Sequence, residues 1–528
     1  MHPIPALAAC LAVLTLAGCQ FGQETEPPDQ VLRLGLSLAY ADPDSVMQGP
    51  LLTWGWNVFD PLVKLDAGSR PVPNVAERWE VSENGLELTF HLRRDGRWSN
   101  GDPLTAHDYV YAWRFNLAES VELFESTGPF ASIAGAEGYA RCVADESECE
   151  PLLDELGVEA PDNYTLTVRF EKPNPFFLST IGGYVCLCFA PLHRESVERY
   201  GDRWHEAGHI VTSGPFTVAE WEVEEKLVLV KDERWRGADE VSLDRIEVSF
   251  WRESEDGIQA VASGDLDVFW APGVRSIQGR HGQTNPLLNS VYVGFNVARV
   301  PDPRQRRAMA LAIDRTDLNE RAYEGAGRPA TSLTADGVPA FERIRSRFLD
   351  ERAALAEAEE LLGQVEQPVD EVTLWTNEER RSEASAVQEA WGRLGLRVTP
   401  RVLDFDQLFT ALSRGRFEAY ITGWVYDFPD AINFLQLWRC DDPDNYTRFC
   451  DRAYDRLLDR ALVERDDAAR VALYAAAERV LTGPEGAMPG APLVWGSLPV
   501  AVGPEVEGFE LNPMAQADLT AVRVARPG

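Results

Sequence analysis

Residues 423–430, with the sequence GWVYDFPD, place two acids among three aromatic residues. An aspartate in such surroundings must be solvated or paired with a cation, because an unpaired buried carboxylate costs several kcal/mol or stays protonated. No lysine or arginine lies between Arg416 and Arg439. If Asp427 is buried, its partner must come from elsewhere in the chain, as an internal salt bridge, or from a ligand that carries an ammonium group. The segment therefore predicts a ligand-binding pocket.

A second run, HEAGH at residues 205–209, matches the HExxH pattern of zinc proteases, in which two histidines one helical turn apart bind the metal and the glutamate activates water. Gly208 inside the run costs about 1 kcal/mol of helix stability, and Pro215 follows too closely for a long helix. We expect a chance match in a loop. The alternative is a lipid-anchored zinc hydrolase with the site residues His205, Glu206 and His209.

Other catalytic patterns are missing from the sequence. It contains no GxGxxG, GxxxxGK[ST] or GxSxG run, which removes the main support for a nucleotide-binding enzyme or a serine hydrolase. Asp427 and Asp430 could form the acid pair of a glycosidase, a further alternative whose carboxylate separation the sequence does not fix. We expect a binding protein that is not an enzyme and needs no cofactor.

The chain of 528 residues has a formal net charge of −35, which argues against one class of partner. Such acidity would repel the phosphates of nucleic acid, so we expect no nucleic-acid partner. Most of the acids are expected on a solvated surface. The length predicts two or three domains.

The amino terminus has the pattern of an export signal. Residues 6–17 form an apolar stretch that is too short to span a bilayer and leads into Leu-Ala-Gly-Cys. By resemblance to bacterial lipoproteins, residues 1–18 would be a signal peptide, Cys19 the acylated first residue of the mature chain, and residues 19–30 a polar tether. No lysine or arginine precedes the apolar stretch, so an ordinary secretory peptide cleaved just before the cysteine is the alternative. We expect an exported lipoprotein, anchored to the membrane and facing the periplasm or the cell exterior.

Six cysteines remain when the one in the leader and the proposed anchor are set aside, and an exported chain can oxidise them. Cys440 and Cys450 flank a turn-rich acidic segment, which predicts a local disulfide. Cys142 and Cys149 flank another acidic loop and are expected to pair in the same way.

The other two cysteines, Cys186 and Cys188, are two residues apart. On a strand they would share one face, so we do not expect them to bond each other. They remain either buried thiols or partners of a cysteine elsewhere. No repeated ligand spacing links the six cysteines, so we expect no metal site.

The periodicity of apolar residues predicts a mixed α/β chain. Strand-like runs occupy residues 31–38, 86–92, 164–170, 227–231 and 246–250. Helical runs occupy residues 351–362 and 468–481. The first of these helices opens a succession suited to a compact α/β lobe, continued by a strand at 372–375, a helix at 384–394 and a strand at 397–402.

Several segments, taken in order, match one known family. The longest match lies at residues 76–108, with AERWEVS followed by LTFHLRRDGRWSNGDPLTAHD. Shorter ones are SGPF at 213–216, SGDLD at 263–267, VGFN at 293–296, RRA at 306–308 and AIDR at 312–315. From about residue 31 to its end, the chain resembles the oligopeptide- and dipeptide-binding proteins of bacterial ABC importers, family 5 of the extracellular solute-binding proteins.

The resemblance implies two α/β lobes joined by a hinge, with an additional domain, which makes three domains. Lobe I would comprise residues 31–58, 185–271 and 495–528, the additional domain 59–184, and lobe II 272–494. The implied function is to capture short peptides in the cleft between the lobes and to deliver them, as a monomer, to an ABC importer permease in the membrane. A family member for another solute, such as a metal chelate or an oligosaccharide, is the alternative.

The resemblance also implies which residues bind the ligand. Asp427 would pair with the peptide's α-ammonium, while the backbone of residues 423–425 would add the peptide as a strand. The ligand-binding residues implied are Gly423, Trp424, Val425, Tyr426 and Asp427 in lobe II, with Gln48, Gly49, Trp270 and Ala271 in the other lobe. Core packing is the alternative for Trp424 and Tyr426. Asp430 is expected either to cap the following helix or to face water.

Overall fold

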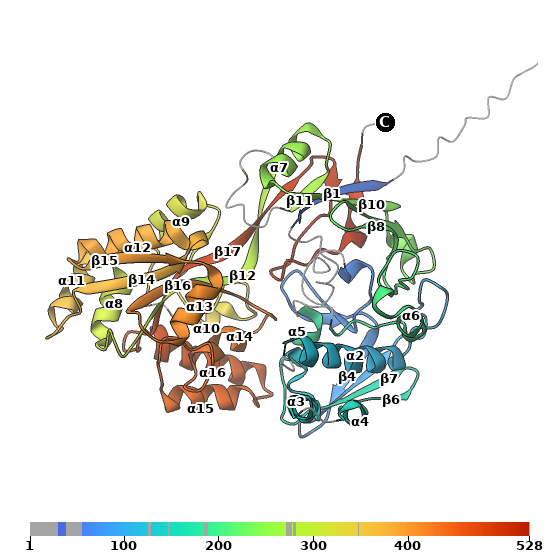
Figure 1. The fold of residues 1–528 in the computed structure, drawn as a ribbon, viewed down its shortest axis with the longest axis horizontal. Helices are drawn as coiled ribbons and strands as arrows, with labels where there is room; N and C mark the ends of the chain where they lie inside the picture. Colours follow the sequence, from blue (N-terminus) through green and yellow to red (C-terminus); the bar gives the residue numbers. More distant parts are fainter. Residues whose placement is uncertain are drawn as a thin grey trace, which may run out of the picture.

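The computed structural model describes residues 30–38, 55–124, 128–145, 148–183, 188–270, 277, 281–346 and 348–526. Two lobes lie side by side, and their buried apolar side chains form separate clusters (Figure 1). The main cluster of lobe I draws on residues 32–270 and 498–524, and the clusters of lobe II draw on residues 288–495 and on Met514. The chain therefore begins in lobe I, crosses to lobe II and returns, as the sequence analysis expected of a mixed α/β protein with two lobes.

One mixed sheet passes through both lobes. Its strands follow the order β15 (Arg397–Leu403), β14 (Glu371–Asn377), β16 (Ala419–Val425), β12 (Gly282–Phe295), β17 (Gly490–Val502), β11 (Val268–Trp270), β1 (Val31–Ser37), β10 (Arg245–Trp251), β9 (Lys226–Lys231) and β8 (Phe216–Glu222). β13 (Arg328–Pro329) also pairs with β17. The predicted strands at 31–38, 227–231 and 246–250 correspond to β1, β9 and β10.

β12 and β17 are the long strands that join the two lobes (Figure 1). They pair antiparallel along most of their length, with a shift of register between Pro286 and Ser290. Proline has no N–H to donate to a neighbouring strand, so an irregularity next to Pro286 agrees with the usual place of proline in sheets. A hinge between the lobes stays a prediction, and these two strands are where it would lie.

A four-stranded antiparallel sheet lies within the range predicted for the additional domain. Its order is β4 (Ala76–Val81), β5 (Glu87–Leu92), β7 (Thr165–Arg169) and β6 (Val158–Asp162). The same range holds the helices α2 (Ala106–Phe124), α3 (Ala136–Ala144), α4 (Glu150–Leu153) and α5 (Phe177–Gly183), and the short strands β2 (Val63–Leu65) and β3 (Pro71–Pro73). Their buried side chains belong to the same cluster as those of lobe I, so the separate domain stays a prediction.

The remaining elements of lobe I are short. They are α6 (Arg194–Tyr200), α7 (Ser254–Ser263), β18 (Val506–Glu507) and β19 (Arg523–Val524).

Aspartates begin many of the helices of lobe II. In five of them the side chain of an aspartate at the N-cap accepts a hydrogen bond from an amide of the first turn, which satisfies a donor that the helix cannot. The five are α8 (Pro303–Leu311), α9 (Arg315–Tyr323), α13 (Phe405–Ser413), α15 (Arg452–Ala461) and α16 (Asp467–Thr482). The other helices of this lobe are α10 (Phe341–Ile344), α11 (Leu355–Gly363), α12 (Arg381–Arg393) and α14 (Ile432–Leu435). Part of the chain's acidity thus serves to start helices.

The start predicted for one helix was wrong. The sequence analysis expected a helix over residues 351–362, but α11 begins at Leu355. The carbonyl of Glu351 instead accepts hydrogen bonds from the amides of Arg315 at 2.8 Å and Thr316 at 3.2 Å. This tertiary contact with the first turn of α9 holds the preceding residues outside the helix.

Both predicted local disulfides are confirmed, because Cys142 bonds Cys149 and Cys440 bonds Cys450. Cys188 is buried and is also disulfide-bonded, so it is not a free thiol. Cys186 and the proposed lipidation site Cys19 lie outside the described residues.

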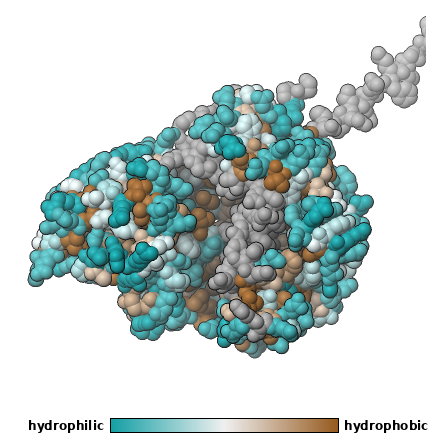
Figure 2. All heavy atoms as spheres, viewed as in Figure 1, coloured by the Kyte–Doolittle hydropathy of each residue, from teal (hydrophilic) through white to brown (hydrophobic). Residues whose placement is uncertain are grey.

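The lobes also touch on the side away from the crossing strands. Phe176, just before α5, stacks on Phe428 of lobe II with ring centroids 5.3 Å apart and an interplanar angle of 5°. Arg465, in the turn before α16, donates to the carbonyl of Glu83. Figure 2 shows a largely hydrophilic outer face and a hollow between the lobes where hydrophobic residues gather. Among the described residues, no helix combines the length and apolar character needed to cross a bilayer.

Candidate ligand-binding site

β16 ends with an open edge at the segment that the sequence singled out. On one side β16 pairs with β12 along its whole length, from Ala419 to Val425. On the other side the described residues of β14 pair with only two of its residues, Ala419 and Tyr420. No described strand therefore pairs with residues 422–425 on that side, which is the arrangement that admits an added strand.

A pocket of about 410 Å³ lies beside this edge, within the usual size of ligand sites. Its lining combines aromatic rings, acids and one arginine. Lining residues with polar groups include Asn377, Glu379, Arg380, Trp424, Asp427, Asp444 and Tyr446. Two apolar rings, Phe405 and Phe409, also line it.

Asp427 lies in this pocket with its carboxylate partly buried. Burial raises the pKa of Asp427 above its usual value, while a hydrogen bond from Asn433 opposes that rise. The Nδ2 of Asn433 donates to Oδ2 of Asp427 at 3.1 Å. No lysine or arginine of the described part of the chain forms an ion pair with Asp427, so the alternative of an internal salt bridge finds no support there. The carboxylate is thus available to form an ion pair with a cation.

Asn433 also holds two neighbours of that carboxylate. Its Oδ1 accepts a hydrogen bond from Nε1 of Trp424 at 2.8 Å and one from the backbone amide of Asp427 at 3.3 Å. One amide side chain therefore fixes the Trp424 ring and Asp427 relative to each other. The sequence analysis missed Asn433, although it lies only six residues after Asp427.

The second acid of the segment has a different role. The Oδ1 of Asp430 accepts a hydrogen bond from the amide of Ile432, the first residue of α14, at 3.0 Å. Asp430 is not the N-cap of α14, which is Ala431, but its hydrogen bond lies in the turn that leads into this helix, and burial raises the pKa of its carboxyl.

The structure brings together some of the predicted ligand residues and separates others. Gly423, Trp424, Val425 and Asp427 all line the pocket. Tyr426 is fully buried: its hydroxyl accepts from the amide of Ala335 at 3.0 Å, which agrees with the core-packing alternative.

Of the residues predicted for the other lobe, only Trp270 is described. It is buried in β11 with 5 % of its surface exposed. Gln48, Gly49 and Ala271 lie outside the described residues. Their contact with a ligand stays a prediction.

Arg380 is a pocket residue that the sequence analysis missed. Its Nη1 lies 3.0 Å from the hydroxyl of Tyr323 and 3.3 Å from Oε1 of Glu383. Its Nη2 lies 3.2 Å from the point where a side chain at Gly423 would begin. A glycine at position 423 therefore leaves room for the guanidinium beside the open edge of β16.

The HExxH run forms no helix. Residues 205–209 lie in turns, Glu206 pairs with Arg203 at 2.6 Å, and the ring of His209 stacks on Tyr200 with centroids 4.0 Å apart. These contacts confirm the expected loop. No group of three or more His, Cys, Asp and Glu side chains in the described residues is arranged to hold a metal ion.

Comparison with known proteins adds an independent finding. Residues 70–446 match the model of a family described as bacterial extracellular solute-binding proteins, family 5. The chain is 30 % identical over 492 residues to a probable deoxycholate-binding periplasmic protein, YgiS, of Escherichia coli K12, covering 89 % of this chain and 88 % of the relative. It is 27 % identical to the periplasmic oligopeptide-binding protein OppA of Salmonella typhimurium, covering 85 % of this chain and 84 % of the relative.

A solved structure is similar over nearly the whole chain. It is the unliganded open form of MppA, the periplasmic murein tripeptide-binding protein, whose Escherichia coli form is also among the similar structures. The TM-score is 0.80 at 26 % identity, with 94 % of this chain and 98 % of that chain covered.

Proposed function

Because the chain belongs to the bacterial extracellular solute-binding proteins, family 5, we propose that it is the substrate-binding protein of an ABC importer and captures short peptides with a free amino terminus. The peptide binds in the hollow between the lobes and lies along the open edge of β16. The protein binds its ligand and catalyses no reaction.

One observation carries the proposal: a partly buried carboxylate without an ion-pair partner in the described residues stands at the end of an open strand edge. The α-ammonium of a peptide offers Asp427 the missing cation, and the peptide backbone pairs with residues 423–425. A charge-assisted hydrogen bond of this kind contributes about 1.5–3 kcal/mol. A ligand without the ammonium leaves the carboxylate unpaired.

Arg380 supports a peptide of limited length. With its ammonium at Asp427, the peptide runs antiparallel to β16 towards Gly423, which lies four residues earlier in the chain. There it meets the guanidinium of Arg380, which suits a terminal carboxylate. A tripeptide or tetrapeptide then has a charged partner at each end.

The charges of the pocket favour this ligand over a bile acid, the ligand named for one relative. Among the described residues, Asp427, Asp444 and Glu379 line the pocket against one arginine, so acids outnumber bases there. The negative charge of deoxycholate would have to approach these carboxylates against electrostatic repulsion. No observation on the described residues favours a metal chelate or an oligosaccharide as the ligand.

The cellular setting completes the proposal. Residues 1–18 direct export, Cys19 carries the lipid, and the monomer presents its ligand-bound form to the permease. Ligand contacts to both lobes shift an equilibrium between open and closed forms. The division into lobe I, the additional domain at 59–184 and lobe II is part of this proposal.

A melting assay on protein freed of co-purified ligand tests the function. Di-, tri-, tetra- and pentaalanine are compared with deoxycholate at one common concentration, and a peptide present at about 100 times its dissociation constant adds about 2.7 kcal/mol of stability. We expect peptides to raise the melting temperature and deoxycholate to leave it unchanged. Stabilisation by deoxycholate alone would overturn the proposal.

A further inference from the structure

An aromatic wall borders the pocket next to the proposed peptide site. Phe405, the first residue of α13, lines the pocket with 63 % of its surface exposed. Its ring centroid lies 4.7 Å from that of Phe409, which lies 5.8 Å from that of Tyr446. An apolar ring this exposed in a pocket that also holds acids is suited to cover the stem of a ligand side chain.

Asp444 lies next to Tyr446, one of the three rings of this wall. Its Oδ1 accepts a hydrogen bond from the hydroxyl of Tyr446 at 3.0 Å. The side chain is half-buried and lines the same pocket as Asp427. Within the described ranges, no lysine or arginine forms an ion pair with Asp444. The single arginine of the pocket, Arg380, pairs with Glu383 instead.

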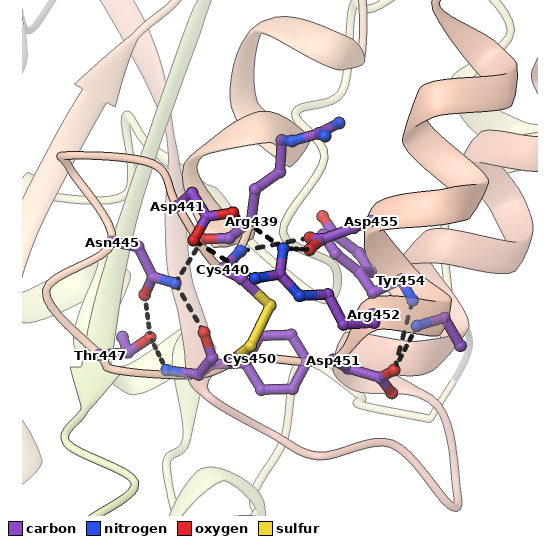
Figure 3. The surroundings of a disulfide bond; sticks show 12 residues. Arg439, Cys440, Asp441, Asn445, Thr447, Cys450, Asp451, Arg452, Tyr454 and Asp455 are labelled. Atoms are coloured by element: carbon purple, nitrogen blue, oxygen red, sulfur yellow. Dashed lines mark hydrogen bonds and ion pairs between the residues drawn. A yellow bond between two sulfur atoms is a disulfide. The ribbon is translucent and has the colours of Figure 1, made fainter.

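A disulfide and several hydrogen bonds hold the loop that carries Asp444 and Tyr446 (Figure 3). The disulfide between Cys440 and Cys450 closes it. Inside the loop, Nδ2 of Asn445 donates to the carbonyls of Arg439 and Phe449, each at 2.7 Å, and its Oδ1 accepts from the hydroxyl of Thr447 at 2.6 Å. Asp444 is therefore held in place before a ligand arrives, which lowers the entropic cost of binding.

We propose that Phe405, Phe409, Tyr446 and Asp444 form a subsite for a lysine or arginine side chain of the bound peptide. This inference rests on the proposed peptide-binding function. The side-chain stem lies along the three rings, its cation reaches the carboxylate of Asp444, and the rings add cation–π attraction. When the α-ammonium has paired with Asp427, Asp444 is the acid next to the aromatic rings that can attract a second positive charge. The residue concerned lies within the first three of the peptide, because both acids line one pocket.

Isothermal titration with matched tripeptides tests the subsite. Trialanine is the reference, and lysine or its uncharged isostere norleucine replaces alanine at each of the three positions. We expect lysine to bind about tenfold or more tighter than norleucine at one position, as for other charge-assisted contacts. Asp444→Asn should bring the two affinities within about twofold of each other, because it should weaken the lysine peptide far more than the norleucine peptide.

Asp441→Asn is the matched control. Asp441 lies in the same loop, but it is exposed and pairs with Arg452 at 2.8 Å. This variant should keep the full preference for lysine.

The possible results separate the two proposals. Tight binding of trialanine with equal affinities for lysine and norleucine at every position overturns the subsite alone. A lysine preference that survives Asp444→Asn also overturns it. Failure of every peptide to bind overturns the proposed function and the subsite together.

Discussion

The side-chain amide of Asn433 joins Asp427 to Trp424: it donates to the carboxylate at 3.1 Å and accepts from the indole Nε1 at 2.8 Å. Because Asn433 belongs to α14, the position of the carboxylate depends on how this short helix packs below β16. The acid proposed to bind the ligand is thus positioned by a residue that does not line the pocket.

Replacing Asn433 with alanine is expected to weaken peptide binding about tenfold, because Asp427 and the Trp424 ring each lose a hydrogen bond that orients them. Titration with trialanine measures the effect. The melting temperature of the ligand-free variant serves as the control for folding. Unchanged affinity in a folded variant would show that Asn433 does not position the site.

The Asp427→Asn variant should be more stable than the parent when no ligand is bound. Burial raises the pKa of Asp427 in the folded protein above its unfolded value, so the charged form destabilises the fold once the pH exceeds the folded pKa. Below the unfolded pKa the carboxyl is neutral in both states and this cost vanishes. We expect the variant to melt a few degrees higher at about pH 8 and to lose the advantage towards about pH 4.

Asp441→Asn is the control for this pH profile. Arg452 lowers the pKa of Asp441, so its carboxylate carries no such cost in the folded state and its removal should not raise the melting temperature. An Asp427→Asn variant less stable than the parent at about pH 8 would contradict the assignment of an unpaired carboxylate.

The two disulfides should differ in their effect on binding. Replacing Cys440 and Cys450 with serine is expected to lower stability by about 2–3 kcal/mol and to reduce the lysine preference, because the loop carries Asp444. Replacing Cys142 and Cys149 should lower stability only, since that loop lies in lobe I away from the pocket. Denaturant unfolding and the matched tripeptides measure both quantities. Equal loss of preference in the two variants would contradict the role given to the loop around Asp444.

The stacked rings of Phe176 and Phe428 should couple the two lobes. A double-mutant cycle with Phe→Leu at both positions is expected to give a coupling of about 0.5–1.5 kcal/mol in the free energy of unfolding. Phe176→Leu combined with Phe417→Leu, whose ring packs on Tyr420 in lobe II, should be additive. Additivity in the first pair would mean that the contact contributes nothing to the joining of the lobes.

The sequence predicted those features whose signals are local. Asp427 and Asp430 lie among the same aromatic residues, and only the family resemblance singled out Asp427 for the ammonium. The disulfides were predictable because each closes a short acidic loop. Asn433 lies just beyond the segment at 423–430, as the second residue of α14, and this closeness in sequence could have indicated a contact with Asp427.

The features that the sequence did not predict come from the order of the strands. Arg380 approaches Gly423 only because β14 and β16 are neighbours that part after two residue pairs. Phe405 and Asp444 meet at one pocket although they belong to separate segments. Tyr426 was grouped with the ligand residues, but β16 ends at Val425 and the chain then turns, so its ring packs in the core.

The central claim is that Asp427 binds a peptide ammonium, and titration of trialanine against N-acetyl-trialanine tests it most directly. The wild-type protein should bind trialanine at least about tenfold more tightly than N-acetyl-trialanine. In Asp427→Asn this ratio of affinities should be smaller, because the variant lacks the charge pair. Any steric effect of the acetyl group persists in the variant. Equal affinities for the two peptides in the wild-type protein would contradict the claim.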